Sequence, residues 1–101
     1  MFRHVVMLRF AAGTPASHHQ KVVDGLRALP PVIPEIRSYS VGADAGLAEG
    51  NWDLVVVADF DDAAGWRHYT AHAAHQAVIA DLIRPVLAER AAVQFDLDRS
   101  D

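Results

Sequence analysis

The sequence predicts one α+β domain whose elements follow the order β-α-β-β-α-β. The chain has 101 residues, of which 51% are hydrophobic and 22% are charged, which is the composition of one folded domain with one core. Residues 3–10 and 52–60 have the apolar patterns of strands, and the segments after Thr14 and Asp61 begin with helix-capping signals. We therefore expect residues 1–101 to form a single domain.

The first half of the chain is expected to form a strand, a helix and a second strand. The face of the first strand, residues 3–10, that is expected to meet the core carries His4, Val6, Leu8 and Phe10. Thr14 is expected as the N-cap of the first helix, with Pro15 at its first position. This helix should run to about Leu29, where a proline-rich segment stops it, and the second strand follows at about residues 35–41.

The second half is expected to form a strand, a long helical region and a last strand. Three consecutive valines mark the centre of the strand at residues 52–60. Asp61-Asp62 should cap a helical region that reaches about Arg90, and the last strand is expected at about residues 92–97. This order is that of the ferredoxin-like fold, a four-stranded antiparallel sheet with both helices on one face.

The face of the sheet opposite the helices is unusually apolar for a monomer. On the first strand Val5 and Met7 point to that face, and on the third strand Val55 and Val57 do the same. An open apolar face of this size exceeds what soluble monomers usually expose. The sequence therefore predicts a homodimer in which two sheets pack face to face.

Composition and charge exclude several classes of partner and site. The chain has no cysteine, which excludes disulfides and thiolate metal sites. The formal net charge is −4 and Lys and Arg do not cluster, so nucleic acid is not an expected partner. No segment approaches the ~18–20 apolar residues of a membrane span, and the first ten residues are too polar for a signal peptide. We expect a cytoplasmic protein.

Three histidines fall within one short segment, at His68, His72 and His75. In an unbroken helix they lie within about 60° of one another and could approach one ion. However, no Asp or Glu occurs between Asp62 and Asp81 to orient such ligands. We therefore expect no metal site.

The same segment carries groups suited to acid–base chemistry. A histidine can remove a carbon-bound proton near neutral pH while a phenol stabilises the enolate that develops. Tyr69 and His75 suit these roles, and His4 is expected to reach the same cavity. In a straight helix Tyr69 and His75 are about 120° apart, so they converge only if the helix breaks between them. The alternative is that Tyr69 is a core aromatic and His4 a buried residue with a satisfied hydrogen bond.

Four segments resemble the stress-responsive α/β-barrel (Dabb) family along essentially the whole chain. These segments are Arg3-His4-Val5-Val6, Val41-Gly42, Asp53-Leu54-Val55-Val56-Val57 and the spacing Tyr69-x-x-His72-x-x-His75. The resemblance implies a ferredoxin-like protomer and a dimeric α/β barrel.

The resemblance also implies candidate site residues. A polyketide cyclase that this pattern distantly resembles closes its substrate by aldol condensation without a cofactor, and its catalytic residues match Tyr69, His75 and His4. Residues expected to contact a substrate are His19, Leu26, Leu54, Trp66 and His72. Family members usually have proline where this chain has Ala73, and the cyclase has a histidine where this chain has Leu54.

Three functions stay open at this point. The leading hypothesis is a homodimer with a small apolar cavity that binds a small organic molecule and performs cofactor-free proton transfer on it. The competing hypothesis is a non-catalytic stress-response or structural dimer. The third is a cofactor-free monooxygenase on the same architecture. None of them requires a metal or a cofactor.

Overall fold

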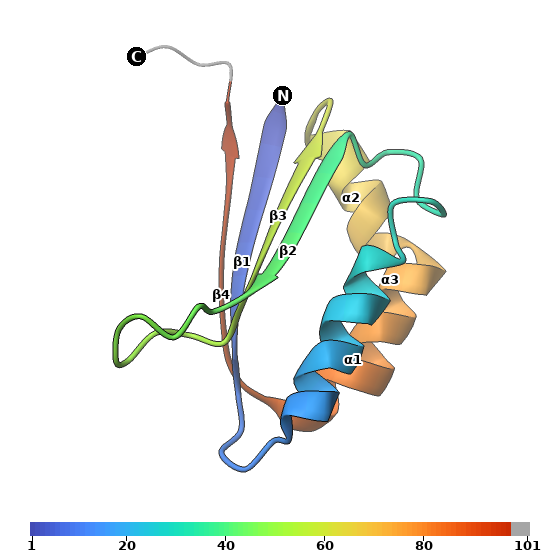
Figure 1. The fold of residues 1–101 in the computed structure, drawn as a ribbon. Helices are drawn as coiled ribbons and strands as arrows, with labels where there is room; N and C mark the ends of the chain where they lie inside the picture. The colour runs from blue at the N-terminus through green and yellow to red at the C-terminus, as the bar shows by residue number, and fades with distance from the viewer. Residues whose placement is uncertain (98–101) are drawn as a thin grey trace.

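The computed structural model describes residues 1–97, which form one antiparallel sheet covered by helices on one face (Figure 1). The strands are β1 (Phe2–Phe10), β2 (Ser38–Ala43), β3 (Leu54–Phe60) and β4 (Leu87–Asp96), in the spatial order β2-β3-β1-β4. The helical elements are α1 (Ala16–Arg27), α2 (Ala63–Ala71), α3 (Ala73–Val78), a π-helical turn η1 (Ile79–Ile83) and a 3₁₀ turn η2 (Arg84–Val86). The predicted ferredoxin-like fold is confirmed. Within residues 1–97, no helix has the length and apolar character that crossing a bilayer requires.

The central strand β1 divides its side chains between the two faces of the sheet. Val6 pairs with Val56 on β3 and Ala92 on β4, and these residues face the helices. The buried residues of β1 are the predicted set: His4, Val6, Leu8 and Phe10. The alternation of a β-strand therefore separates the core from the open face as expected.

The core lies between the sheet and the helices. Its largest fully buried side chains are Tyr69, Phe60, Ile33, Val22 and Val56. Fully burying one such aliphatic or aromatic side chain stabilises the fold by about 1.5–3 kcal/mol. The core therefore fixes α1 and α2 against the same face of the sheet.

The first helix begins later and ends earlier than predicted. Pro15 rather than Thr14 is its N-cap, and the Thr14 hydroxyl instead donates to the Ala11 carbonyl at 2.6 Å. The helix ends at Arg27, two residues before Leu29, yet Leu29 remains buried in the core. The prediction of a Thr14 cap was wrong because this hydroxyl closes the preceding turn.

The boundaries of β2 and β3 also move. β2 extends to Ala43 and begins at Ser38, because a turn that includes Glu35 and Ile36 follows the prolines. β3 begins at Leu54, two residues after Trp52, and the Asp53 carboxylate next to its start accepts a hydrogen bond from the Phe10 amide at 2.7 Å.

The second helical region is divided and does not reach Arg90. Asp62 caps α2 as predicted, since its Oδ1 accepts from the Gly65 amide at 2.9 Å. Pro85 has no amide hydrogen, and the chain becomes extended at Leu87. β4 therefore starts five residues before the predicted position, with Leu87 paired to Phe10.

A candidate acid–base cavity between sheet and helices

A cavity of about 270 Å³ lies between the sheet and the helical layer. Its aliphatic wall includes Val6, Leu8, Leu26, Val56, Ile79 and Ile83. Its polar and titratable side chains are those of His4, Tyr69, Thr70, His75, Arg84 and Arg90. A mostly apolar cavity with a few convergent polar groups is typical of a small-molecule site.

A break in the helical region brings Tyr69 and His75 together. His72, at φ −65° and ψ 136°, is extended and separates α2 from α3. Its Nδ1 accepts a hydrogen bond from the Ala74 amide at 3.0 Å, so this histidine is the N-cap of α3. As a result the ring centroids of Tyr69 and His75 lie 4.3 Å apart.

The phenol of Tyr69 is buried and has a partner that the sequence analysis missed. Its hydroxyl lies 2.8 Å from that of Tyr39 on β2. Burial raises the pKa of both phenols, whereas their hydrogen bond raises the pKa of Tyr39 and lowers that of Tyr69. Either hydroxyl can be the donor in this bond, and donation by Tyr39 leaves the Tyr69 hydrogen available for another acceptor.

The imidazole of His75 has an unsatisfied nitrogen. Its Nδ1 is buried and has no hydrogen-bond partner among residues 1–97. Burial lowers the pKa of His75, the Thr70 backbone acts in the opposite direction, and the positive charge of Arg90 lowers the pKa further. His75 is therefore neutral at neutral pH, the state that a general base requires.

His4 is the most strongly perturbed titratable group of the cavity. Burial lowers its pKa to about 4, with smaller contributions from Arg90 and His75. Gln94 Nε2 donates to its Nδ1 at 2.8 Å, so the neutral ring carries its hydrogen on Nε2. The His4 ring lies 6.2 Å from that of Tyr69, between centroids.

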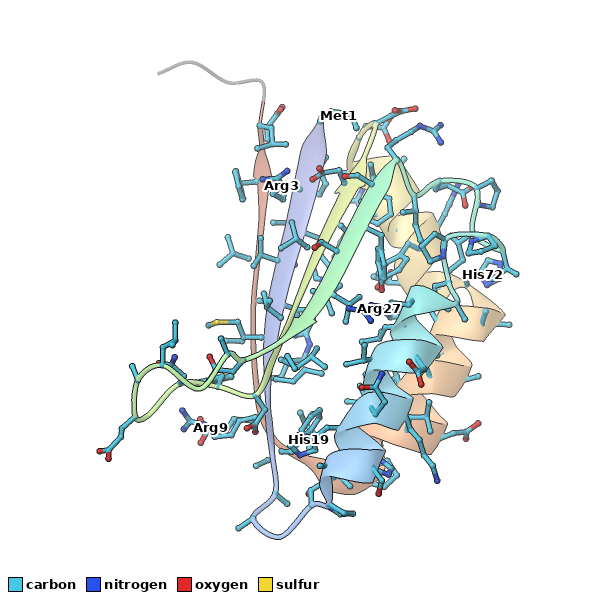
Figure 2. All side chains as sticks on the ribbon, viewed as in Figure 1. Met1, Arg3, Arg9, His19, Arg27 and His72 are labelled. Atoms are coloured by element: carbon cyan, nitrogen blue, oxygen red, sulfur yellow. The ribbon has the colours of Figure 1, made fainter. Side chains whose placement is uncertain are left out.

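The five residues expected to contact a substrate do not share one environment. Leu26 lines the cavity, whereas Leu54 is a core residue that borders a different hollow. Trp66 packs 5.9 Å from the His4 ring, and His19 packs 4.6 Å from the Phe10 ring. Figure 2 shows His72 on the helical layer, on the far side from the sheet. Only Leu26 of this set lines the cavity.

Residues that the sequence analysis did not single out either line the cavity or hydrogen-bond to its side chains. Tyr39 shares the inner face of β2 with Val41, so its position on the strand was a usable signal. Gln94 lies opposite His4 in the pairing of β1 with β4. The sequence did not predict this pairing, because the start of the last strand was placed five residues too late. Arg84 and Arg90 come from the segment that was predicted to be helical.

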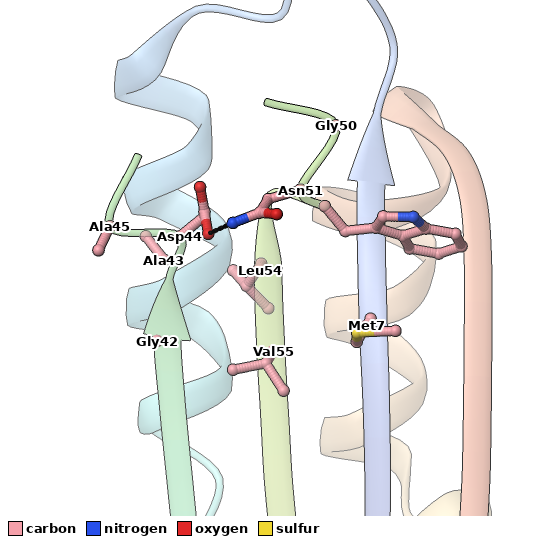
Figure 3. A pocket seen from close by; sticks show the side chains of 10 residues that line it. Met7, Gly42, Ala43, Asp44, Ala45, Gly50, Asn51, Leu54 and Val55 are labelled. Carbon is pink, nitrogen blue, oxygen red and sulfur yellow. Dashed lines mark hydrogen bonds between the residues drawn. The ribbon is translucent and has the colours of Figure 1, made fainter. Parts of the chain in front are cut away.

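A second, larger hollow of about 500 Å³ lies on the opposite face of the sheet, beneath the loop between β2 and β3 (Figure 3). Met7 and Val55 form its floor, and its one carboxylate, Asp44, accepts a hydrogen bond from the Asn51 side chain at 3.0 Å. This hollow has no convergent titratable groups, so the smaller cavity is the better candidate for chemistry. Within residues 1–97, no three His, Asp or Glu side chains are grouped so as to hold a metal ion.

The chain is similar to known families and structures over most of its length. The sequence model of the family described as Stress responsive A/B Barrel Domain matches residues 2–97. A dimeric ferredoxin-like protein of unknown function from Thermobifida fusca YX is 44% identical, with a TM-score of 0.88 over 95% of this chain and 90% of that chain. None of the curated proteins matches this sequence.

More distant structures share the fold alone. A dimeric protein of unknown function with a ferredoxin-like fold from Bacteroides fragilis NCTC 9343 is 23% identical, with a TM-score of 0.82 over 95% of each chain. A hydroxynitrile lyase from Passiflora edulis is 12% identical, with a TM-score of 0.83 over 99% of this chain and 95% of that chain.

Proposed function

Because the chain belongs to the stress-responsive A/B barrel domain family, we propose that it is a homodimer whose inner cavity binds a small organic molecule. We further propose that His75 and Tyr69 transfer a proton on that molecule without a cofactor. The observation that carries the proposal is the convergence of Tyr69, His75 and His4 on one cavity of about 270 Å³.

The open face of the sheet supports the homodimer. Two rows of apolar side chains cross β3, β1 and β4 on this face: Val55-Met7-Ala91 and Val57-Val5-Val93. Within residues 1–97 no helix lies over this face of the sheet (Figure 1). Val93 on it is 62% exposed. Each Å² that a second sheet removes from water contributes about 25 cal/mol. The similar protein from Thermobifida fusca is described as dimeric.

The cavity supports proton abstraction next to a carbonyl. In this reaction the neutral imidazole of His75 accepts the carbon-bound proton, and the C–H electron pair moves through the carbonyl to its oxygen. The Tyr69 hydroxyl donates a hydrogen bond to that oxygen as its charge develops, and Tyr39 holds the phenol in place. Return of the proton from the imidazolium to carbon or oxygen completes the cycle.

Unsatisfied groups distinguish this proposal from a purely structural role. His4 and Tyr69 each have a hydrogen-bond partner in the fold, as a non-catalytic dimer would also require. The buried Nδ1 of His75, however, has no partner among residues 1–97, and such a group costs about 1–3 kcal/mol. An apolar side chain at this position would avoid this cost, so the fold alone does not account for a histidine here.

Exchange of carbon-bound protons tests the proposal directly. Small aryl ketones are incubated in D₂O with the wild type, His75→Ala, Tyr69→Phe and a surface control, His68→Ala, and exchange next to the carbonyl is followed by NMR. We expect the wild type and the control to accelerate exchange, and the two cavity variants to lose about 10²–10⁴-fold of the effect. Thermal-shift measurements with the same ketones report binding separately.

Two results would contradict the proposal in different ways. Binding that stabilises the protein without exchange would retain the cavity and reject the proton transfer. If no ketone binds and all four proteins melt and behave alike, the non-catalytic dimer is the correct reading.

A further inference from the structure

Two arginines at the rim of the cavity have no anionic partner in the described chain. Arg84 lies on η2 and Arg90 on β4, and both line the cavity. Neither guanidinium forms an ion pair or a hydrogen bond with residues 1–97. Three arginines elsewhere bind carboxylates of this chain: Arg3, Arg9 and Arg37.

The positive charge of Arg90 acts on the imidazoles inside the cavity. Burial is the largest cause of the lowered pKa of His4, and the positive charge of Arg90 is the next. For His75 burial again lowers the pKa most, the Thr70 backbone acts in the opposite direction, and Arg90 lowers the pKa further. No Asp or Glu is among the residues that line the cavity. The imidazoles are neutral at neutral pH, so the two guanidinium groups set the sign of the local potential. An anion entering the cavity meets positive charge that nothing else in its lining neutralises.

The wall of the cavity sets the rest of the ligand's chemistry. Seven aliphatic side chains form most of it, and its volume of about 270 Å³ is just below the usual range of about 300–1,000 Å³ for drug-sized ligands. The body of the ligand must therefore be small and apolar. A planar guanidinium binds a carboxylate through two parallel hydrogen bonds, which makes a carboxylate the matching anionic group.

We propose that the cavity selects small organic carboxylates, with the carboxylate at Arg84 and Arg90 and the apolar body on the aliphatic wall. This inference rests on the proposed binding function and names its ligand class. A ligand held in this way directs the part of its body beyond the carboxylate towards Tyr69 and His75. The positive rim also stabilises the negative charge of an enolate formed there.

A pair of probes that differ only in charge tests this proposal. Phenylacetate and its neutral amide, phenylacetamide, have the same number of heavy atoms and the same apolar ring. Their dissociation constants are measured by NMR titration of the imidazole signals, with inorganic phosphate as a third probe. We expect the wild type to bind phenylacetate roughly ten-fold or more tightly than the amide, because the acid forms charge-assisted hydrogen bonds.

The variant that tests the assignment is Arg84→Gln combined with Arg90→Gln. Both side chains are exposed, so the substitutions leave the core intact. We expect this variant to bind the acid and the amide equally, whereas Arg67→Gln, which removes an exposed arginine outside the cavity, keeps the preference.

Each contrary outcome overturns a distinct part of the proposal. Equal binding of acid and amide by the wild type would reject selection by charge and leave the cavity itself supported. Phosphate that binds as tightly as phenylacetate would reject the role of the apolar wall. If neither acid nor amide perturbs the imidazole signals, the proposed binding function fails together with this inference.

Discussion

Replacement of His4 by asparagine should remove a large part of the acid sensitivity of the fold. His4 is only 4% exposed, and burial lowers its pKa from 6.5 to about 4. Asparagine does not titrate, and its side-chain oxygen can accept the hydrogen bond that Gln94 Nε2 donates to the imidazole. The variant therefore separates the proton from the hydrogen bond.

The sign and size of the effect follow from the lowered pKa. Between about pH 6.5 and pH 4 the unfolded chain binds a proton at His4 that the folded chain does not, so the free energy of unfolding falls as the pH falls. Well below pH 4 the loss levels off at about 3 kcal/mol, and between pH 7.5 and pH 4.5 it amounts to about 2.5 kcal/mol. Burial of the ring leaves little solvent to reduce this figure.

Urea denaturation at pH 7.5 and pH 4.5 measures the effect, at one protein concentration and with the oligomeric state checked by light scattering. Other groups contribute equally to both proteins, so the quantity of interest is the difference between the two pH-dependent losses. We expect His4→Asn to lose about 2.5 kcal/mol less than the wild type, and the exposed control His68→Asn to behave as the wild type. Parallel losses in His4→Asn and the wild type would show that the buried imidazole takes up its proton without penalty, and would refute the reasoning.

Three further substitutions test other parts of the structure. Val55→Arg places a charge on the open face of the sheet and should give a monomer by light scattering. The control Leu47→Arg, at a loop position that is 91% exposed, should stay dimeric. A dimeric Val55→Arg would reject the interface. Asp62→Ala removes the N-cap of α2 and should lower the free energy of unfolding by about 1 kcal/mol in urea denaturation. Asp62→Asn can still cap the helix and should keep most of the wild-type stability. Equal losses in the two variants would show that charge rather than capping matters. Tyr39→Phe leaves the Tyr69 hydroxyl without its partner and should lower the free energy of unfolding by about 1–3 kcal/mol in urea denaturation. It should also raise the pKa of Tyr69 in an ultraviolet titration. An unchanged titration would contradict donation by Tyr39.

The sheet was predictable from the sequence because each strand reports its own environment. The alternation in residues 3–10 and the valine run at its neighbour β3 identify both faces, and the register of the structure agrees with them. The capping role of Asp62 was equally local, since it depends only on an amide three residues later. Such signals need no knowledge of the tertiary structure.

The cavity was less predictable because it depends on where a helix stops. No proline marks the break at His72; its own imidazole caps α3, and a histidine is not a residue from which a cap is expected. The start of β4 depends on pairing with Phe10, far away in the chain, rather than on local propensity. The helix break, which the sequence left open, and the start of β4, which was predicted too late, both lie in the segment that supplies His75, Arg84 and Arg90. The rim therefore could not be derived from the pattern alone.

The alternation of β1 makes one strand part of two separate surfaces. Its even-numbered side chains, from His4 to Leu8, line the cavity, and Val5 and Met7 belong to the open face. Slippage by one residue would exchange the two sets, so the pairing of β1 with its neighbours fixes both surfaces at once. If self-association through the open face changes the affinity of the cavity for a ligand by some factor, linkage requires that the ligand change the association constant by the same factor. Protein concentration would then act on the cavity as an effector does.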